Sequence, residues 1–408
     1  MVELLAPINN FETLQAAIDN GCNSVYFGLQ QLNMRQSANN FELNQLPKVV
    51  SLCHSNNVRA YLTLNSIVFD DELSMVEKIV CAAKESGVDA IICWDMGVAQ
   101  ICRKYDIEIH LSTQASVANF SALKFYYDQG FKRFVLAREL SIEQIKSIID
   151  KIHLHKMDAE VECFVHGAMC VSVSGRCFIS HMLFNQSANR GKCLQPCRRE
   201  YLVKDKETGD ELVIGNNYIL SPKDLCALSL IPELKEIGVH AFKIEGRMKQ
   251  ADYVAKVVKV YKEAIDFYDK FKDDSNFTKL YDYFIDEKMN VLKEVFNRDF
   301  HTGFYEKVPS CEITDKYGSV ASLKKVFIGN VKNFYKKINV AELTILTNEE
   351  LKVGDRICVI GNTTGYKEQI LKEMQHNGNH VDIAHQNDRV GIKLEFEVRP
   401  NDKVFVLR

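Results

Sequence analysis

The stretch that decides the fold is residues 59–93, RAYLTLNSIVFDDELSMVEKIVCAAKESGVDAIIC. It begins with an apolar run from Arg59 to Leu64, continues through a segment of amphipathic helical period, and ends with a second apolar run from Asp89 to Cys93. Short apolar runs predict buried strands, and a helix between two of them predicts a parallel pair. The stretch therefore reads as one strand–helix–strand unit.

The same unit recurs from residue 1 to about residue 270. Its apolar runs are Glu3 to Leu5, Ser24 to Phe27, Arg59 to Leu64, Asp89 to Cys93, Glu108 to Leu111, Arg133 to Leu136, Glu160 to Val165 and Ala241 to Ile244. Each except the seventh leads directly into a helical segment. Eight strands without a glycine-rich dinucleotide turn favour a closed (β/α)8 TIM-like barrel over an open doubly wound sheet. We expect this barrel to occupy residues 1–270.

The pattern changes after the eighth strand. Helical segments of mixed charge run from about Asp252 to Asn297, and Pro309 marks the start of a different pattern. From about residue 315 onward, short alternating runs are separated by turn signals such as Gly354-Asp355. We predict a helical connector over residues 271–312 and a small β-barrel domain over residues 313–408.

One long interruption separates the seventh strand from a helix predicted to begin near Asp224. Its cysteines are Cys170, Cys177, Cys193 and Cys197, at intervals of six, fifteen and three residues, and Cys226 follows them. Loops after the strands of a barrel form its catalytic rim, so the interruption should lie there. The first two gaps are wider than those of structural zinc sites and favour an iron–sulfur cluster. The alternative is a group of buried apolar thiols.

Composition narrows the class of protein. The formal net charge of −3 gives no overall attraction to nucleic acid or anionic membrane, so such partners would need local basic patches. No run approaches the roughly 18 apolar residues that span a bilayer, and the first residues lack a signal-peptide pattern. We expect a soluble cytoplasmic protein whose thirteen cysteines are free thiols or metal ligands. Nothing in the sequence indicates an oligomeric state or a membrane partner.

The segment from Glu162 to Cys197 resembles the signature of peptidase family U32, the collagenase-like peptidases, many of which are iron–sulfur hydroxylases. Further similar stretches are residues 5–7 (LAP), 61–65 (YLTLN), 110–114 (HLSTQ), 135–141 (VLARELS), 243–249 (KIEGRMK) and 296–298 (FNR). The resemblance implies a 4Fe-4S cluster. Carried over by position, its ligands would be Cys170, Cys177, Cys193 and Cys226, with Cys197 as the competing fourth ligand.

The resemblance also implies insertion of oxygen into an aromatic ring or a nucleobase. Members of the family hydroxylate the wobble uridine of tRNA with prephenate as oxygen source, a cytidine of ribosomal RNA, or a ubiquinone precursor. The tRNA branch is similar in length and joins a barrel to a β-domain that resembles the second domain of elongation factors. We expect a prephenate-dependent tRNA hydroxylase. The alternatives are a collagenase-like peptidase, a hydroxylase of the other substrates, and a non-catalytic accessory protein.

Charged residues at strand ends are candidates for binding the substrate. Alternation places Lys243 and Glu245 on one side of the eighth strand, where a cation beside a carboxylate suits a carboxylated cosubstrate or a phosphate. A structural ion pair is the alternative. Arg138 ends the sixth strand and could clamp a substrate, as could Arg35. With Arg247, these cations form the predicted substrate-binding set.

Uncharged polar groups complete the predicted site. Asn65 and Gln114 follow the third and fifth strands and suit a base edge or a small acid, unless they cap the next helix or turn. His166 could donate a proton near the cluster, although a hydrogen-bonded structural histidine is the alternative. We assign His166, Glu245 and Asn65 to catalysis and Gln114 to substrate binding.

Cations and aromatic residues alternate in the C-terminal region. They are Lys324, Lys325, Lys332 and the run Phe334-Tyr335-Lys336-Lys337. Such interleaving is typical of RNA-contacting surfaces, and an ordinary solvated strand face is the alternative. We expect tRNA to contact this domain.

Overall fold

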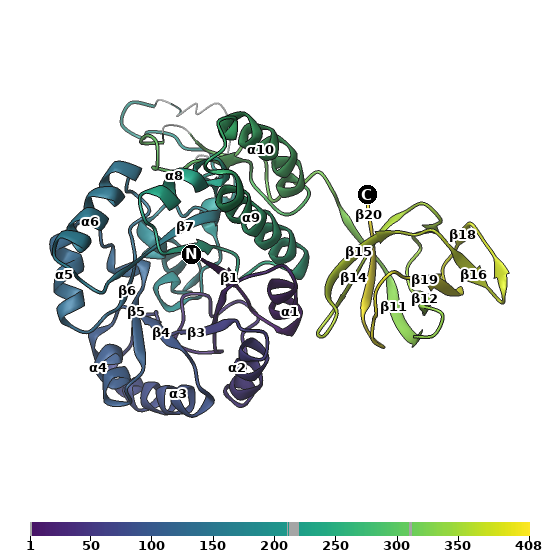
Figure 1. The fold of residues 1–408 in the computed structure, drawn as a ribbon, viewed down its shortest axis with the longest axis horizontal. Helices are drawn as coiled ribbons and strands as arrows, with labels where there is room; N and C mark the ends of the chain where they lie inside the picture. The colour runs from purple at the N-terminus through teal and green to yellow at the C-terminus, as the bar shows by residue number, and fades with distance from the viewer. Residues whose placement is uncertain (1, 210, 212–219, 310–311) are drawn as a thin grey trace.

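The computed structural model describes residues 2–209, 211, 220–309 and 312–408, and its first part is a closed parallel barrel (Figure 1). The barrel strands are β1 Glu3–Pro7, β2 Ser24–Gly28, β3 Arg59–Thr63, β4 Ala90–Cys93, β5 Glu108–Leu111, β6 Arg133–Val135, β7 Glu160–Ala168 and β9 Ala241–Ile244. Each strand from β1 to β6 pairs in parallel with the next, and β9 closes the barrel between β7 and β1. The eight strands and the TIM-like fold are confirmed.

Helices surround the barrel as an outer ring. They are α1 Phe11–Asp19, α2 Leu46–His54, α3 Leu73–Ser86, α4 Met96–Lys104, α5 Phe120–Asp128, α6 Ile142–Leu154, α8 Ile231–Glu236 and α9 Ala251–Phe271. Helix α6 shows why they form, because Ser141 caps it through the backbone N–H of Gln144. Five isoleucines then recur at helical spacing and are buried against the strands: Ile142, Ile145, Ile148, Ile149 and Ile152.

The helix predicted to begin near Asp224 is wrong, because that segment is strand β8 (Asp224–Cys226). Strand β7 is nine residues long, and its last three residues pair antiparallel with β8. Backbone groups at the end of β7 need partners, and this pairing supplies them. Strand β10 (Phe300–His301) then pairs with β8, and the helix begins only at Ile231. The insertion between β7 and β8 contains helix α7 (Ile179–Phe184).

Charged side chains fill the amino-terminal half of the barrel. Arg133 donates two hydrogen bonds of 2.9 Å to the carboxylate of Glu3, which also accepts one from Tyr61. Burial alone would raise the pKa of Glu3, but the contact with Arg133 holds it at about 2. One layer further along, Lys243 Nζ lies 2.6 Å from Oε1 of the fully buried Glu162. The barrel interior is therefore built on ion pairs.

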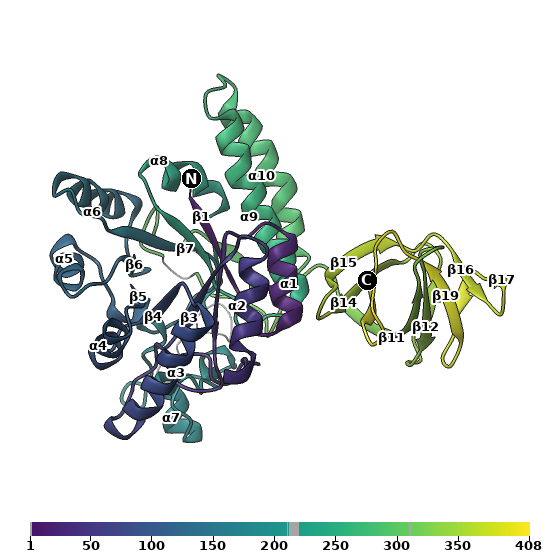
Figure 2. The same cartoon turned by 60° about the horizontal axis from the view of Figure 1, so that its bottom comes forward.

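An antiparallel β-region follows the barrel, as predicted (Figure 2). Its strands are β11 Lys325–Tyr335, β12 Val340–Ile345, β13 Leu351–Lys352, β14 Arg356–Gly361, β15 Gly365–Ile370, β16 Met374–His376, β17 Asn379–His380, β18 Ile383–Ala384, β19 Arg389–Lys393 and β20 Lys403–Leu407. Alternate residues of β12 (Ala341, Leu343 and Ile345) are buried in its own core. Helix α10 (Phe277–Lys293) packs on α9 and precedes this region. Helix α9 ends at Phe271, and β11, the first strand of the β-region, begins at Lys325.

The β-region packs on the barrel through α1 and α9. Strand β15 lies against both helices, where Gly365 comes so close to Ala16 that an added Cβ would be 3.0 Å from its backbone nitrogen. Around this contact, Arg356 binds Glu294 with two hydrogen bonds of 2.8 and 2.9 Å. No helix among the described residues combines the length and apolar character needed to cross a bilayer.

Candidate active site

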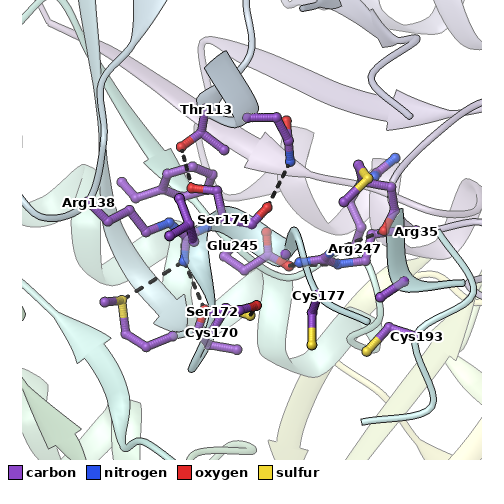
Figure 3. A pocket seen from close by; sticks show the side chains of 18 of the residues that line it. Arg35, Thr113, Arg138, Cys170, Ser172, Ser174, Cys177, Cys193, Glu245 and Arg247 are labelled. Atoms are coloured by element: carbon purple, nitrogen blue, oxygen red, sulfur yellow. Dashed lines mark hydrogen bonds and ion pairs between the residues drawn. The ribbon is translucent and has the colours of Figure 1, made fainter. Parts of the chain in front are cut away.

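A cavity of about 300 Å³ opens at the carboxyl ends of the barrel strands (Figure 3). Its walls come from the loop after β2, the strand ends, the insertion after β7 and the loop after β9. The insertion is held in place at Gly191, which has a φ of +80° and lies against the loop after β2. An added Cβ there would be 2.1 Å from the Asn33 carbonyl oxygen. The cavity thus lies at the catalytic rim that the barrel fold predicts.

Four of the five candidate ligand cysteines line this cavity: Cys170, Cys177, Cys193 and Cys197. Two of the thiols accept backbone hydrogen bonds, since Ile179 N–H and Gln195 N–H each lie 3.4 Å from the sulfur two residues earlier. Burial raises the pKa of Cys193 and Cys197, and the neighbouring thiols raise it further. A bound cation would reverse this shift, because it favours thiolates.

Four cavity thiols, two of which accept backbone N–H groups, are donors of the kind that hold iron–sulfur clusters. Within the part of the chain that the structure describes, no three His, Cys, Asp or Glu residues are close enough together to hold one metal ion. N–H···S hydrogen bonds to the ligating sulfurs tune such clusters. Thiols and amides of this kind are both present.

The fifth cysteine, Cys226, lies outside the cavity. Its thiol is buried at the end of β8, 3.7 Å from the Tyr261 hydroxyl and 3.8 Å from the Met289 sulfur. The structure therefore places Cys197, rather than Cys226, beside the other three thiols. Ligation through Cys226 would require its thiol to leave Tyr261.

The three predicted arginines line the cavity, with Arg35 and Arg247 together at one side and Arg138 at the other (Figure 3). Arg35 Nη2 lies 3.0 Å from Glu245 Oε1, and Arg247 donates to Thr63 Oγ1 at 2.8 Å. Burial, with Arg35 nearby, lowers the pKa of Arg247 to about 10. Arg138 donates to the Ala168 carbonyl oxygen, lies 3.8 Å above the Phe164 ring, and leaves its buried Nε without a partner. An unpartnered buried N–H at a cavity wall is suited to an anionic ligand.

Lys243 and Glu245, which we predicted on one side of the strand, both line the cavity but bind different partners. Lys243 binds Glu162 at the floor of the cavity, whereas Glu245 binds Arg35 at its wall. Alternation correctly placed both side chains on the same side, but the closed barrel pairs β9 with β7, where the Lys243 side chain reaches Glu162, two residues before its register partner Phe164. The cation is thus already neutralised inside the protein.

The structure places His166, which we assigned to catalysis, outside the cavity. Its ring is 2% exposed, does not line the cavity, and packs against Tyr253, Tyr261 and Phe300. His166 Nδ1 lies 3.2 Å from the Tyr261 hydroxyl, which itself donates to the Val165 carbonyl oxygen. Burial lowers the pKa of His166 to about 3. His166 is a neutral structural residue.

This burial predicts an effect on stability. The folded pKa lies below the usual 6.5, so the stability that neutral His166 contributes above pH 6.5 is lost as the pH falls toward 3. The free energy of unfolding of the native protein should fall between pH 7 and pH 5, and we expect His166→Phe to make this fall about 2 kcal/mol smaller. Urea unfolding at both pH values measures it, with the exposed His155→Phe as control. If the stability of His166→Phe depended on pH as that of the native protein does, His166 could not be held neutral by the fold.

Asn65 and Gln114 line the cavity but serve mainly to join its loops. Asn65 accepts the Met34 backbone N–H and donates to Ser112 Oγ at 3.1 Å. Gln114 Nε2 donates to the Ser174 carbonyl oxygen at 3.2 Å and thereby ties the loop after β5 to the insertion. Asn65, which we assigned to catalysis, is better described as a positioning residue.

Three cations of the cavity were missed. Arg198, Lys249 and Arg298 line it beside the thiols, and burial lowers the pKa of Lys249 to about 7. Lys249 and Arg298 belong to stretches 243–249 and 296–298, which resemble the U32 family, so this resemblance could have identified both as site residues. In all, the described lining residues include seven cationic side chains and two carboxylates. The cavity is suited to anions.

Comparison with known proteins places these features in a family. The sequence profile of Peptidase family U32 matches residues 9–315. A Methanocaldococcus jannaschii protein named "Uncharacterized protease MJ0090" is 44% identical over 100% of this chain and 98% of its own. A Porphyromonas gingivalis protein named "Collagenase" is 38% identical over 99% and 97%. The Bacillus subtilis "tRNA hydroxylation protein P1" is 33% identical over 98% and 93%. The chain belongs to peptidase family U32.

Proposed function

We propose that this chain is an iron–sulfur-dependent RNA hydroxylase that forms 5-hydroxyuridine at the wobble position of tRNA, with prephenate as oxygen donor. The observation that carries the proposal is the meeting of four thiols and an excess of cations in one cavity. Among the relatives, the Bacillus subtilis protein named for tRNA hydroxylation supports an RNA substrate.

The thiols would hold the cluster. Cys170, Cys177 and Cys193 supply three ligands, and Cys197 or Cys226 supplies the fourth. A 4Fe-4S cluster held there would supply redox chemistry beside the bound base. The overall reaction replaces a ring C–H with C–OH, so the base is oxidised by two electrons while the oxygen donor gives up one oxygen atom and is reduced by two electrons.

The chain's own cations would bind both anionic reactants. Arg138 offers an unpartnered Nε, and Arg247 also lines the cavity. Together they suit the carboxylates of prephenate. A wobble base is already unpaired and can enter a barrel mouth that a duplex base could not reach. On the β-region, Lys332, Lys336 and Lys337 are exposed around Tyr335 and would contact the rest of the tRNA. Lys336 also forms an ion pair with Glu397, and Lys325 is engaged by Asp252 of α9.

Nucleoside analysis tests the proposal. Mass spectrometry of tRNA and ribosomal RNA from cells with and without this protein should show loss of 5-hydroxyuridine and its derivatives from tRNA only. The same loss in cells unable to make prephenate would support the oxygen donor. Unchanged hydroxylated nucleosides in both RNA pools would overturn the RNA assignment. A change confined to ribosomal RNA would show that the substrate is ribosomal RNA and not tRNA.

Arg138 provides a prediction about the cosubstrate. Arg138→Met should raise the KM for prephenate by at least about tenfold, because a hydrogen bond to a charged group contributes about 1.5–3 kcal/mol. Steady-state kinetics with purified protein measures it. Arg103→Met is the control, since Arg103 is exposed on α4 away from the cavity. An unchanged KM would exclude Arg138 from the cosubstrate site.

The name of the Porphyromonas gingivalis relative favours one second candidate, a peptidase that cleaves collagen-like substrates. Cysteine and serine peptidases need a general base beside the nucleophile, usually histidine. No histidine is among the described residues that line the cavity. Gelatin cleavage by purified protein that contains no iron would support the peptidase. Absence of cleavage by both the iron-free and the iron-loaded protein would exclude it.

A further inference from the structure

A second, smaller cavity of about 160 Å³ lies beside the first on the same rim. Its described lining residues are Met34, Ile67, Trp94, Gln114, Arg176, Phe178 and Asn189. Met34 and Gln114 line both cavities, so the two cavities adjoin at these side chains. A ligand that extends out of the first cavity past Met34 and Gln114 would reach the second cavity.

Aromatic surface dominates the second cavity. Trp94 is the only tryptophan of the chain, and its indole N–H donates to the Asn65 carbonyl oxygen at 2.9 Å, which fixes the ring. The Arg176 guanidinium lies 5.4 Å from the centre of that ring and donates to the Gln114 carbonyl oxygen. Phe178 stands at the edge with 69% of its surface exposed. Its exposed ring is therefore available for stacking beside the cavity.

The polar groups of this cavity complement a heteroaromatic ring. Asn189 Oδ1 accepts the Cys177 backbone N–H, while its Nδ2 makes no hydrogen bond within the described residues. That amide is therefore free to donate to a ring nitrogen or carbonyl oxygen. Arg176 adds a positive charge that suits a nearby phosphate.

We propose that this second cavity binds the nucleobase next to the one in the first cavity, stacked between Phe178 and the Trp94–Arg176 pair. The inference rests on the proposed RNA substrate. Continuity with the first cavity selects this occupant, because neighbouring bases of one unpaired strand are joined covalently. Every base has a ring face that can stack, so the subsite would bind the strand without selecting its sequence.

Binding of synthetic anticodon stem–loops to the full-length, cluster-loaded protein tests this subsite. One RNA is intact, and two others are abasic immediately 5′ or immediately 3′ of the target uridine. Each is titrated against the native protein, Phe178→Ala and the control Met182→Ala. Met182 is 79% exposed on the same insertion and lines neither cavity. Both replaced side chains are exposed, so folding should be unaffected.

We expect one abasic RNA to bind the native protein about tenfold more weakly than the intact RNA, as loss of one stacked base predicts. Phe178→Ala should lose a similar factor with intact RNA and lose little more with the abasic RNA, because both changes remove the same contact. Met182→Ala should behave as the native protein. Emission of Trp94, the sole tryptophan, should change with intact RNA and less with the abasic RNA.

Two results would overturn the subsite: independent, multiplicative losses from Phe178→Ala and the abasic change, or no loss from either abasic RNA. Hydroxylation of the target uridine is followed in the same samples. Absence of product with a preserved stacking effect would count against the proposed hydroxylation but not against the subsite. Failure of all three RNAs to bind would overturn both.

Discussion

Cys177→Ala should abolish iron binding and hydroxylation together while leaving the barrel folded. Cys177 is half-buried on the cavity wall, and its sulfur accepts the Ile179 N–H at the start of α7. Changes in groups that only support a metal ligand already cost about 10–100-fold, so loss of a ligand itself should lower kcat/KM by at least about 100-fold. Iron and sulfide content, the visible absorbance of the cluster, and turnover measure the result.

Stability separates a catalytic cluster from a structural one. The barrel core lies below the insertion and does not depend on Cys177, so the urea midpoint of Cys177→Ala should stay near that of the native protein. A cluster that serves only to hold the fold would instead lower this midpoint wherever activity is lost. Cys81→Ala is the matched control, because Cys81 is half-exposed on α3 far from the cavity. It should keep both iron and activity.

Two further variants would identify the fourth cysteine ligand of the proposed cluster. The position of Cys197 in the cavity favours it, whereas the family resemblance favours Cys226, which is buried beside Tyr261. We expect only one of Cys197→Ala and Cys226→Ala to lose iron as Cys177→Ala does. Retention of full iron content by both variants would contradict ligation by four cysteines.

The barrel could be predicted from sequence because each strand carries its own signal. Runs such as Glu108–Leu111 and Ala241–Ile244 are short, apolar and followed by amphipathic helices, and the structure has both with these bounds. Strand β8 carries no such signal. Its three residues form a strand because the end of β7 offers unpaired backbone groups, which depends on tertiary structure.

The positions of several candidate site residues could likewise be predicted from the sequence, but their interaction partners could not. Position after a strand correctly brought Arg35, Gln114, Arg138 and Arg247 to one cavity. It did not reveal their partners, because partners come from strands distant in sequence. His166 illustrates the point, since its surroundings are supplied by α9 and β10, about 90 and 130 residues further along the chain. Pairing, not position, decides whether a charged group is free to bind substrate.

Lys243→Met should therefore act on stability before it acts on substrate binding. Lys243 is 4% exposed and Glu162 is fully buried, so the change leaves a buried carboxylate with only Arg133, at 3.6 Å. Glu162 Oε2 already lacks a hydrogen bond. Removing one partner of a buried ion pair typically costs about 3–5 kcal/mol, and we expect a loss of that order in the free energy of unfolding by urea.

The double variant Lys243→Met with Glu162→Gln distinguishes a structural role from a binding role. It removes both charges, so it should recover most of the stability that the single variant loses, as expected for residues that interact directly. If Lys243 instead binds the cosubstrate, the single variant should unfold as the native protein does but show a raised KM for prephenate, and Glu162→Gln should not compensate. The first outcome would make Glu162 and Lys243 part of the charged barrel core and would leave the anionic reactants to the other cavity cations, Arg138 and Arg247 among them.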